Sequence, residues 1–260
     1  MKRFKNKTVI ITGAGSGIGR ATAIRFAQEG AEVVLVGRNQ EKLMETAKLL
    51  PQDHSWIHDD NYLTITCDIS SYEQVTKMME AIMERFEHID ILVNNAGQAI
   101  QGKVADLSID DWQQSINVNL NGTFYVSQAA LPYLITSKGN IVNVSSISGA
   151  GGNWKMPAYN AAKAGVTNLT RTMAMDYGKD GVRINAVSPG VTKTNMTTDI
   201  HNNDEKTQKY LAHCPLGRIA TPEDVAAAIT FLASDDASMI NGVDLPVDGG
   251  VSASSGQPQF

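Results

Sequence analysis

Short runs of apolar, β-branched residues alternate along this chain with longer stretches in which apolar residues recur three or four positions apart. The first pattern is typical of buried strands and the second of amphipathic helices. We predict seven strands, at residues 8–12, 32–36, 63–67, 89–93, 140–144, 183–187 and 243–247. About six helices are predicted between them, starting near Gly17, Gln40, Ser71, Asp110, Pro157 and Pro222.

This alternation of strands and helices predicts an α/β fold with one parallel, seven-stranded, doubly wound sheet. Connections between parallel strands are almost always right-handed, so we expect helices on both faces of the sheet. Neither a Pro/Ser-rich linker nor an internal repeat divides the chain. We therefore predict a single domain over residues 1–260.

One segment, residues 196–213, breaks the pattern because it is polar and only weakly periodic. Stretches of this length between two well-defined elements are often functional lids or disordered insertions. We predict that it is a mobile substrate lid within the domain. Ligands of doubly wound sheets bind beyond the carboxyl ends of the strands, so the residues that follow each strand are the candidates for a site.

Composition and charge narrow the classes of function. Hydrophobic residues make up 42% of the 260 residues and charged residues 19%, which indicates an ordinary globular protein rather than a fibrous or disordered one. The net charge of −5 disfavours nucleic acid as a partner. Neither a secretory signal nor a run of ~18 apolar residues is present, so we expect no membrane association and a cytoplasmic location. Cys67 and Cys214 are expected to be reduced thiols.

A glycine-rich turn follows the first predicted strand and opens the first helix. Its glycines, Gly13, Gly17 and Gly19, have the spacing GxxxGxG. Glycines let the backbone turn sharply and approach a diphosphate, whose charge is stabilised by the free N–H groups at the helix N-terminus. A tight strand-to-helix corner would explain the glycines without a ligand, but the place on the first strand of an α/β chain favours a dinucleotide site.

The end of the second predicted strand indicates which dinucleotide is preferred. A site for NAD would carry a carboxylate there for the ribose 2′-hydroxyl, whereas this chain has Gly37 and Arg38. A guanidinium suits a 2′-phosphate, so we predict NADP(H), with NAD(H) as the alternative. Arg38 would otherwise stack on the adenine or pair with Glu41. Asp68, after the third strand, is predicted to accept from the adenine amino group, although an Asp there is also an ordinary N-cap.

Tyr159 and Lys163 form a candidate catalytic pair. They are four residues apart on the helix that begins near Pro157, so their side chains share one face. An ammonium group stabilises a phenolate, and we expect Lys163 to lower the pKa of Tyr159 so that its hydroxyl can donate and accept a proton. Ser146 follows the fifth strand and is placed to hydrogen-bond a substrate carbonyl. Ser145 is the alternative serine, but the spacing to Tyr159 favours Ser146.

Taken together, these motifs resemble those of the short-chain dehydrogenase/reductase family over nearly the whole chain. The shared segments are Thr12–Gly19, Asn94–Gly97, Asn119, Ser146, Tyr159 with Lys163, Pro189–Gly190 with Thr194, and Val247–Gly250. The resemblance implies a Rossmann-type fold and a catalytic tetrad of Asn119, Ser146, Tyr159 and Lys163. It also implies a cofactor site formed by Gly13, Ser16, Gly17, Ile18, Gly19, Asn95, Ala96, Gly97, Tyr159, Lys163, Pro189, Gly190, Val191 and Thr194.

The mechanism implied by this resemblance is hydride transfer between the nicotinamide and a carbinol or carbonyl carbon. Tyr159 would move the proton, Ser146 would position the substrate oxygen, and Asn119 would anchor a water that relays the proton. Lys163 would lower the pKa of Tyr159 and hold the nicotinamide ribose. The cofactor supplies the difficult chemistry, while the protein supplies orientation.

A narrower resemblance, to the acetoin reductase/2,3-butanediol dehydrogenase group, comes from residues 151–154, 193–197 and 247–258. NAD-dependent members of that group place an Asp near the end of the second strand, and Gly37-Arg38 departs from this. The resemblance also implies a homotetramer, built partly on the helices that begin near Asp110 and Pro157.

The sequence thus predicts an NADP(H)-dependent oxidoreductase for a small hydroxyketone, diketone or related carbonyl compound. Gln98, Ser148 and Trp154 are expected to line the substrate pocket. Alternative substrates are 3-oxoacyl thioesters, sugars and cyclic or steroid alcohols, and the alternative class is a redox sensor that binds a dinucleotide without turnover. His54 and His58 have a spacing that suits a metal, but the segment lacks helix signals, so we expect no metal site.

Overall fold

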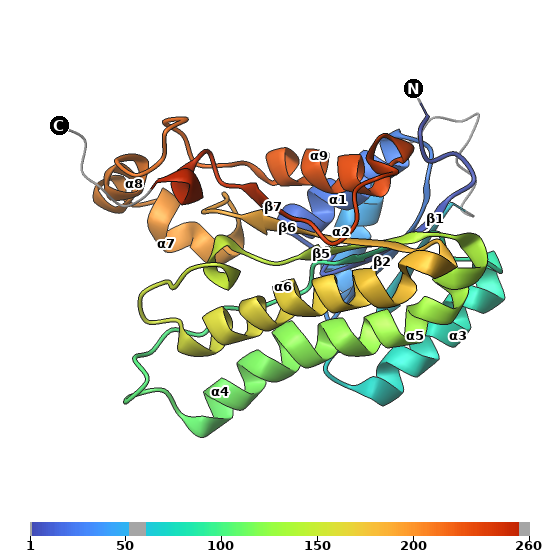
Figure 1. The fold of residues 1–260 in the computed structure, drawn as a ribbon, viewed down its shortest axis with the longest axis horizontal. Helices are drawn as coiled ribbons and strands as arrows, with labels where there is room; N and C mark the ends of the chain where they lie inside the picture. Colours follow the sequence, from blue (N-terminus) through green and yellow to red (C-terminus); the bar gives the residue numbers. More distant parts are fainter. Residues whose placement is uncertain (1, 52–60, 255–260) are drawn as a thin grey trace.

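A seven-stranded parallel sheet forms the centre of the computed structural model, which describes residues 2–51 and 61–254 (Figure 1). The strand order is β3-β2-β1-β4-β5-β6-β7, so the chain changes direction across the sheet between β1 and β4. The strands are β1 (Thr8–Thr12), β2 (Glu32–Gly37), β3 (Tyr62–Thr66), β4 (Ile91–Asn94), β5 (Asn140–Val144), β6 (Arg183–Pro189) and β7 (Asp244–Val247). The predicted fold class is confirmed.

The strand ends differ from the prediction by one or two residues. β4 begins at Ile91 rather than at residue 89, because the Asp90 carboxylate accepts the Thr8 N–H at 3.0 Å at the start of β1. β6 continues to Pro189, which pairs with Val247 on β7. This extension carries the chain further toward the carboxyl edge of the sheet, where the candidate site lies.

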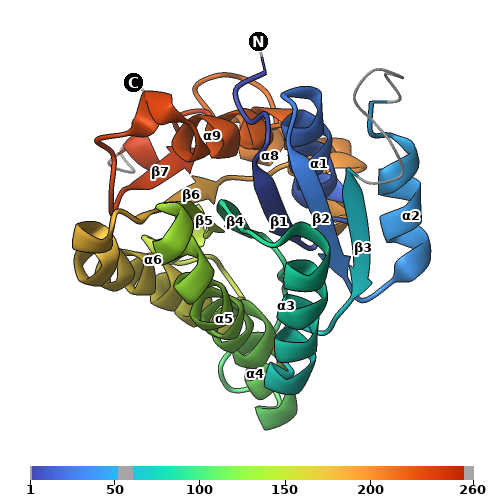
Figure 2. The same ribbon diagram turned by 90° about the vertical axis from the view of Figure 1, so that its right-hand side faces the viewer.

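Helices cover both faces of the sheet, and Figure 2 shows the two layers from the side. In chain order they are α1 (Gly17–Gln28), α2 (Gln40–Lys48), α3 (Tyr72–Phe86), α4 (Ile109–Ile116), α5 (Gly122–Ser137), α6 (Pro157–Tyr177), α7 (Thr198–His201), α8 (Asp204–Leu211) and α9 (Pro222–Ala233). Buried side chains of α1, α2 and α9 pack on one face, and those of α3, α5 and α6 pack on the other.

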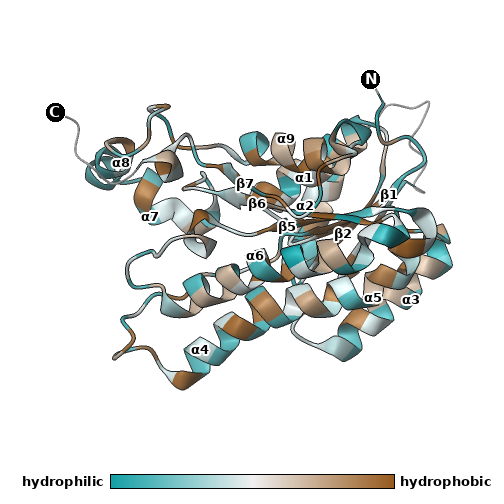
Figure 3. Cartoon of the chain, viewed as in Figure 1, coloured by the Kyte–Doolittle hydropathy of each residue, from teal (hydrophilic) through white to brown (hydrophobic). Residues whose placement is uncertain are grey.

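Two hydrophobic clusters, one on each face, hold these layers together. Phe26 of α1 and Ile229 of α9 belong to the first cluster, while Met78 of α3 and Leu134 of α5 belong to the second. All four side chains are fully buried. Figure 3 shows the hydrophobic colour along the central strands and the more hydrophilic colour on outlying segments such as α8. The alternating sequence pattern thus corresponds to two helical layers on an apolar sheet.

The segment 196–213 is more regular than its sequence pattern indicates, since it contains α7 and α8. The Asn203 side chain accepts the Lys206 N–H at 3.0 Å and caps α8, and Lys209 pairs with Glu205 one turn earlier at 2.6 Å. Local capping and charge pairs therefore form helices here without a strong apolar stripe.

Another departure lies between α4 and α5, where the residues Asn117–Asn121 form a π-helical turn. Helix α4 is joined to α5 by this turn, and α4 packs against α6. Single π-helical turns inside helices occur frequently at functional sites. This turn contains Asn119, one of the predicted site residues.

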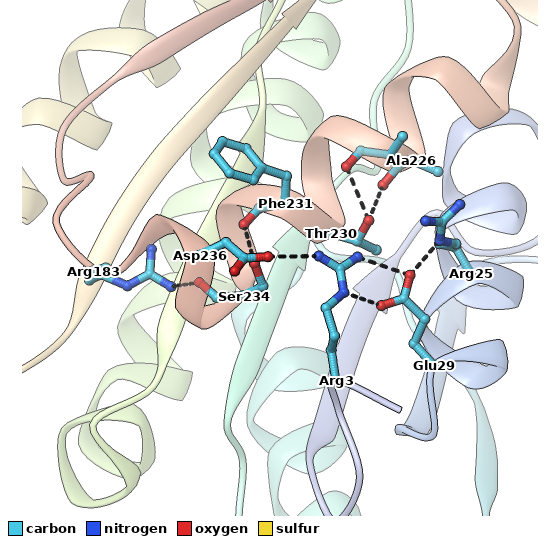
Figure 4. A network of polar contacts seen from close by, with 10 residues as sticks. Arg3, Arg25, Glu29, Arg183, Ala226, Thr230, Phe231, Ser234 and Asp236 are labelled. Carbon is cyan, nitrogen blue, oxygen red and sulfur yellow. Dashed lines mark hydrogen bonds and ion pairs between the residues drawn. The ribbon is translucent and has the colours of Figure 1, made fainter. Parts of the chain in front are cut away.

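The opposite, amino-terminal edge of the sheet carries a charged network (Figure 4). Arg3 donates to the buried Glu29 carboxylate at 2.5 and 2.9 Å, Arg25 donates to it at 2.5 Å, and Arg3 also lies 3.6 Å from Asp236. Burial alone would raise the pKa of Glu29, but the hydrogen bonds from the two guanidinium groups outweigh it and lower the pKa. The network ties the chain before β1 to the end of α1.

Within the described ranges, no helix is both long and apolar enough to cross a bilayer. Among the same residues, no cluster of three His, Cys, Asp or Glu side chains is placed to bind a metal. The pair His54 and His58 lies outside the described residues. Cys67 and Cys214 are buried free thiols, and burial raises the pKa of Cys67 to about 11.

Candidate functional site

The glycine-rich turn between β1 and α1 requires its glycines for two reasons. Gly13 and Gly17 have φ angles of +68° and +51°, which side chains rarely adopt. A Cβ on Gly19 would lie 2.2 Å from the Gly13 carbonyl oxygen. The turn therefore folds back on itself so closely that no other residue fits at the start of α1.

The N-terminus of α1 suits an anion. Ser16 stands at the N-cap position in an extended conformation, and its side chain makes no capping hydrogen bond. The first N–H groups of a helix have no partner within the helix, so here they stay available to an incoming acceptor. Because the glycines also keep Cβ atoms out of the approach, the residues present fit a dinucleotide diphosphate.

Two contacts connect the glycine-rich turn at residues 13–19, called the glycine corner below, with the rest of the carboxyl edge of the sheet. The Asn95 side chain, after β4, donates to the Thr12 carbonyl at 2.8 Å and to the Gly13 carbonyl at 3.3 Å. Thr194, after β6, has its methyl group 3.0 Å from the position of a Cβ on Gly17. Asn95 therefore holds the shape of the corner, in addition to its predicted place along the adenosine, and Thr194 lies beside the start of α1.

The adenosine end of the predicted cofactor site lies beyond β2 and β3. Arg38 is exposed and makes neither a hydrogen bond nor an ion pair with any residue that the structure describes, so the pairing with Glu41 is absent among them. Lys42 of α2 lies against the corner, with its Cβ 3.0 Å from the position of a Cβ on Gly15. Sequence reasoning missed Lys42, because its proximity to Gly15 arises only when α2 packs on the corner.

Asp68 forms local hydrogen bonds in the turn before α3, close to the capping role that was the alternative to a contact with adenine. Its carboxylate accepts from the Ser70 N–H at 3.0 Å and from the Ser70 hydroxyl at 2.7 Å. This turn precedes α3, whose N-cap is Ser71. One carboxylate oxygen is thus committed to the turn, and the contact with adenine stays a prediction.

The structure brings Tyr159 and Ser146 together. The Ser146 hydroxyl, at the end of β5, hydrogen-bonds the Tyr159 hydroxyl on α6. Burial raises the pKa of Tyr159, and the hydrogen bond from Ser146 opposes this rise. The expected lowering of this pKa by Lys163 is absent in this structure, because desolvation of the phenolate outweighs the other contributions.

Lys163 is buried, and its charge has no carboxylate partner among the described residues. Its Nζ donates to the Val144 carbonyl at 2.7 Å and lies 5.6 Å from the centroid of the Tyr159 ring. Burial lowers the pKa of Lys163 to about 8. The ammonium is thus held beside Tyr159 by a backbone oxygen at the end of β5.

Close packing of the loop after β5 on α6 sets the position of Ser146. Ser145 donates to the Lys163 carbonyl at 3.1 Å and lies 2.7 Å from the Thr167 hydroxyl. A Cβ on Gly149 would lie 2.9 Å from each of these three oxygen-bearing groups. Ser145 therefore has a packing role, and Ser146 is the serine that contacts Tyr159.

The fourth predicted catalytic residue, Asn119, is fully buried in the π-helical turn. Its amide donates to the Gln98 and Ser115 carbonyls at 2.9 Å each, and its Oδ1 accepts the Gln98 N–H at 3.1 Å. Asn119 thus fixes the loop after β4, next to Gly97 and Lys163. Its contact with a water stays a prediction.

The predicted substrate-pocket residues lie on two loops near Tyr159. Gln98 follows β4, and its side chain donates to the Gln114 carbonyl at 3.4 Å. Ser148 is buried next to Ser146, while Trp154 is 95% exposed. Asn153 donates to the Ser148 hydroxyl at 2.6 Å, a contact that sequence reasoning did not find because the loop has no periodic pattern.

The turn after β6 meets the segment 196–213. The Tyr210 hydroxyl lies 3.0 Å from the position of a Cβ on Gly190 and bonds the backbone of Val191. Burial, followed by the nearby Cys214, raises the pKa of Tyr210 to about 12, so the phenol stays protonated. The segment is therefore anchored at Gly190 and Val191, two of the predicted cofactor-binding residues.

Comparisons with known proteins agree with this geometry. A family model described as enoyl-(acyl carrier protein) reductase matches residues 13–252. The chain is 48% identical over 258 residues to meso-2,3-butanediol dehydrogenase of Serratia marcescens, covering 99% of both chains. It is 39% identical over 253 residues to a 3-oxoacyl-[acyl-carrier-protein] reductase of Thermotoga maritima, covering 96% of this chain and 99% of that protein. A Caenorhabditis elegans short-chain dehydrogenase/reductase of unknown function, solved with cofactor, superposes with a TM-score of 0.88 at 37% identity and 98% coverage of both.

Proposed function

The chain belongs to the short-chain dehydrogenase/reductase family, and on that premise we propose that it transfers a hydride between NADP(H) and a small secondary alcohol or ketone. The proposal rests on one observation: Ser146, Tyr159 and Lys163 lie together at the carboxyl edge of the sheet, the edge that also carries the uncapped N-terminus of α1. A dinucleotide bound at that terminus would extend along the carboxyl edge of the sheet, where its nicotinamide would supply or accept the hydride beside Tyr159.

Each residue has a separate role in this proposal. Bound NADP(H) supplies or accepts the hydride at its nicotinamide. Ser146 donates a hydrogen bond to the substrate oxygen, and Tyr159 gives or takes the proton at that oxygen. Lys163 carries the positive charge that favours the phenolate and binds the nicotinamide ribose, while Asn119 keeps the loop after β4 closed against the site.

The preference for NADP(H) rests on Arg38 and Lys42. Both are cations beside the adenosine end of the corner, and Arg38 has no acidic partner within the described part of the chain. A 2′-phosphate bound there would gain charge-assisted hydrogen bonds that a 2′-hydroxyl cannot make. NAD(H) is the alternative cofactor, and the name of the Serratia relative does not decide between the two.

Replacing Arg38 with Leu tests the cofactor proposal. A lost charge-assisted hydrogen bond is worth about 1.5–3 kcal/mol, so the Kd for NADPH should rise about 10- to 150-fold while that for NADH changes little. The measurement is a fluorescence titration of each nucleotide. The control is Lys48→Leu, which removes a charge at the far end of α2. Equal effects of R38L on both nucleotides would refute a contact with the 2′-phosphate.

For the substrate we propose a small hydroxyketone or diketone, since the Serratia relative is named for 2,3-butanediol. A spectrophotometric panel with NADPH and NADH against diacetyl, acetoin, acetoacetyl thioesters, cyclic ketones and sugars tests this assignment. We expect the highest kcat/KM with diacetyl or acetoin. The name of the Thermotoga relative makes 3-oxoacyl thioesters the second candidate substrates. A higher kcat/KM with acetoacetyl thioesters than with diacetyl or acetoin would select this second candidate.

Tyr159→Phe is the control for catalysis in the same panel. It removes the proton donor but keeps the ring, so kcat should fall by at least ~10²–10⁴-fold while the Kd for NADPH stays near that of the wild type. If the variant turned over at the wild-type rate, Tyr159 would not be the acid. If the wild type bound NADPH without reducing any carbonyl, the alternative of a redox sensor would be favoured.

We further propose a cytoplasmic homotetramer in which the segment 196–213 closes over the substrate. Trp112, Phe124 and Met175, on α4, α5 and α6, are large apolar side chains exposed to solvent and suit burial between subunits. A tetramer of the 28.0-kDa chain would elute with a mass of about 112 kDa in light scattering. Tyr210 holds the segment to Val191, so in this proposal the segment moves about that contact when it closes.

A further inference from the structure

We propose that Asn153 is a positioning residue that directs the Ser146 proton toward the substrate oxygen through the Ser148 hydroxyl. The inference rests on the proposed function, because it assigns a role at the same site. Asn153 does not contact Tyr159 or Lys163 in any described interaction, so it would act only through the two serines.

The contacts form a continuous chain from the loop surface to the catalytic tyrosine. The Asn153 amide donates to the Ser148 Oγ at 2.6 Å, and the Ser148 and Ser146 hydroxyl oxygens are 3.1 Å apart. Ser146 in turn hydrogen-bonds Tyr159. Ser146 and Ser148 are both buried, so each hydroxyl has few alternative partners.

The direction in which the hydroxyl protons point decides whether Ser146 can donate a hydrogen bond to the substrate oxygen. When Ser146 donates to Ser148, its single proton is not available to a substrate oxygen or to Tyr159. Hydroxyl hydrogens rotate, however, and Asn153 is a pure donor toward Ser148. When a substrate oxygen arrives, Ser148 can therefore donate to Ser146 while Asn153 continues to donate to Ser148.

In that second arrangement the lone pairs of Ser146 are filled. Its Oγ accepts the Ser148 N–H at 3.1 Å and the Ser148 hydroxyl proton, so its own proton points to the substrate oxygen or to Tyr159. Hydrogen bonds aligned in one direction polarise and strengthen one another in a low dielectric. Asn153, at the solvent end of this series of hydrogen bonds, thus sets the direction in which Ser148 and Ser146 donate.

The loop that carries Asn153 is fixed well enough for this role. The Asn160 side chain on α6 donates to the Asn153 carbonyl at 3.0 Å. Two residues on, the Lys155 carbonyl accepts the Gly102 N–H at 2.9 Å, and Lys155 has a φ angle of +58° that non-glycine residues rarely adopt. The backbone on both sides of the amide is therefore held in one conformation.

Asn153→Asp reverses the donor with almost no change of shape. A carboxylate accepts the Ser148 proton, which forces Ser146 to donate to Ser148 and away from the substrate. We expect kcat with the best panel substrate to fall about five- to tenfold, the loss of one neutral hydrogen bond, with little change in KM. The pH profile of kcat should shift to higher pH, because the phenolate loses the Ser146 proton.

The double variant with Ser148→Ala separates this role from a structural one. Once Ser148 has no hydroxyl, Asn153→Asp should lower kcat by less than about twofold further, since coupled residues are non-additive. Gln101→Glu, which adds the same charge on an exposed loop position nearby, should leave kcat unchanged. A wild-type kcat in N153D, or a full independent loss in the double variant, would overturn the proposal.

A second measurement does not depend on turnover. The ionisation of Tyr159 is followed at 295 nm as the difference between each protein and its Tyr159→Phe counterpart, with thermal melts to show that both are folded. Asn153→Asp should raise the pKa of Tyr159, and an unchanged pKa would contradict the inference. This titration tests the chain of hydroxyls even if no substrate in the panel is reduced, an outcome that would count against the proposed function alone.

Discussion

Lys163 is a charge buried without a carboxylate partner among the residues that the structure describes. Its Nζ donates to the Val144 carbonyl at 2.7 Å, and desolvation lowers its pKa from 10.5 to about 8. Below pH 8 both the folded and the unfolded chain carry this proton, and the folded state bears the free energy of desolvating the charge. The site therefore reduces the stability of the protein that carries it.

Comparison with Lys163→Met should reveal the cost of the buried charge as a pH dependence of the free energy of unfolding. Between pH 8 and 10.5 the unfolded wild type binds one proton more than the folded state, so stability rises with pH. Over that range the wild type should gain about 3 kcal/mol relative to K163M, from 2.5 pKa units at 1.36 kcal/mol each. Urea denaturation of both proteins without nucleotide, from pH 7 to 10.5, measures the difference. A constant difference would mean that Lys163 titrates normally.

The grouping of the candidate catalytic residues was largely predictable from the sequence, but their electrostatics were not. Tyr159, Lys163 and Ser146 follow from helical spacing and strand ends, and the structure places them together. The pKa of Tyr159 was expected to fall, whereas burial raises it. Lys42 and Asn153 were missed for a related reason, since their contacts arise from packing between segments that the sequence pattern does not connect.

At the scale of an element, the loop between β5 and α6 is the most sensitive part of the site. It places Ser146 opposite Tyr159 only because Gly149 lets its backbone approach α6, where a Cβ would lie 2.9 Å from three oxygen atoms. Such contacts are too short for any side chain, so an added methyl group must push the loop and the helix apart.

Gly149→Ala should therefore lower both stability and activity. Overpacking costs typically about 1–3 kcal/mol, and a shift of Ser146 away from Tyr159 should reduce kcat more than KM. Gly151→Ala is a matched control on the same loop, because its Cβ would meet only the Ile147 carbonyl at 3.8 Å. Urea denaturation and steady-state kinetics measure both variants, and equal behaviour would show that the loop adapts freely.

Elements were predicted well where the hydrophobic pattern is strong and poorly where local polar contacts decide. All seven strands were expected within a few residues. The helices of the segment 196–213 were not, because α8 is formed by the Asn203 cap and the Lys209–Glu205 pair rather than by an apolar stripe. The π-helical turn around Asn119 was not predicted, because the one-residue shift that it introduces falls between α4 and α5, where the apolar pattern is too short to reveal it.

On the scale of the whole molecule, the charged network and the candidate site lie at opposite edges of the sheet. The candidate catalytic residues lie at the carboxyl edge, while Glu29 with Arg3 and Arg25 connects segments at the amino-terminal edge (Figure 4). A change in this network should therefore alter the free energy of unfolding without altering kcat.

Glu29→Gln tests this separation. The carboxylate is buried and its pKa is lowered, so its contribution is present above the unfolded pKa and is lost as pH falls through the folded pKa. E29Q should be about 1–3 kcal/mol less stable at pH 7, with a smaller difference below about pH 4. Glu73→Gln, which breaks the exposed pair with Lys77, should cost less than about 0.5 kcal/mol. A lowered kcat in E29Q would show that the two edges are coupled.

The crossover between β3 and β4 also separates two groups of candidate site residues along the sequence. Arg38, Lys42 and Asp68, at the adenosine end of the proposed cofactor site, precede this point in the chain, and Ser146, Tyr159 and Lys163 follow it. A chimaera of two related chains joined near residue 90 would therefore take Arg38 and Lys42 from one parent and Ser146, Tyr159 and Lys163 from the other. Under the proposed function, related chains can therefore differ in their preferred cofactor and still share the same reacting residues.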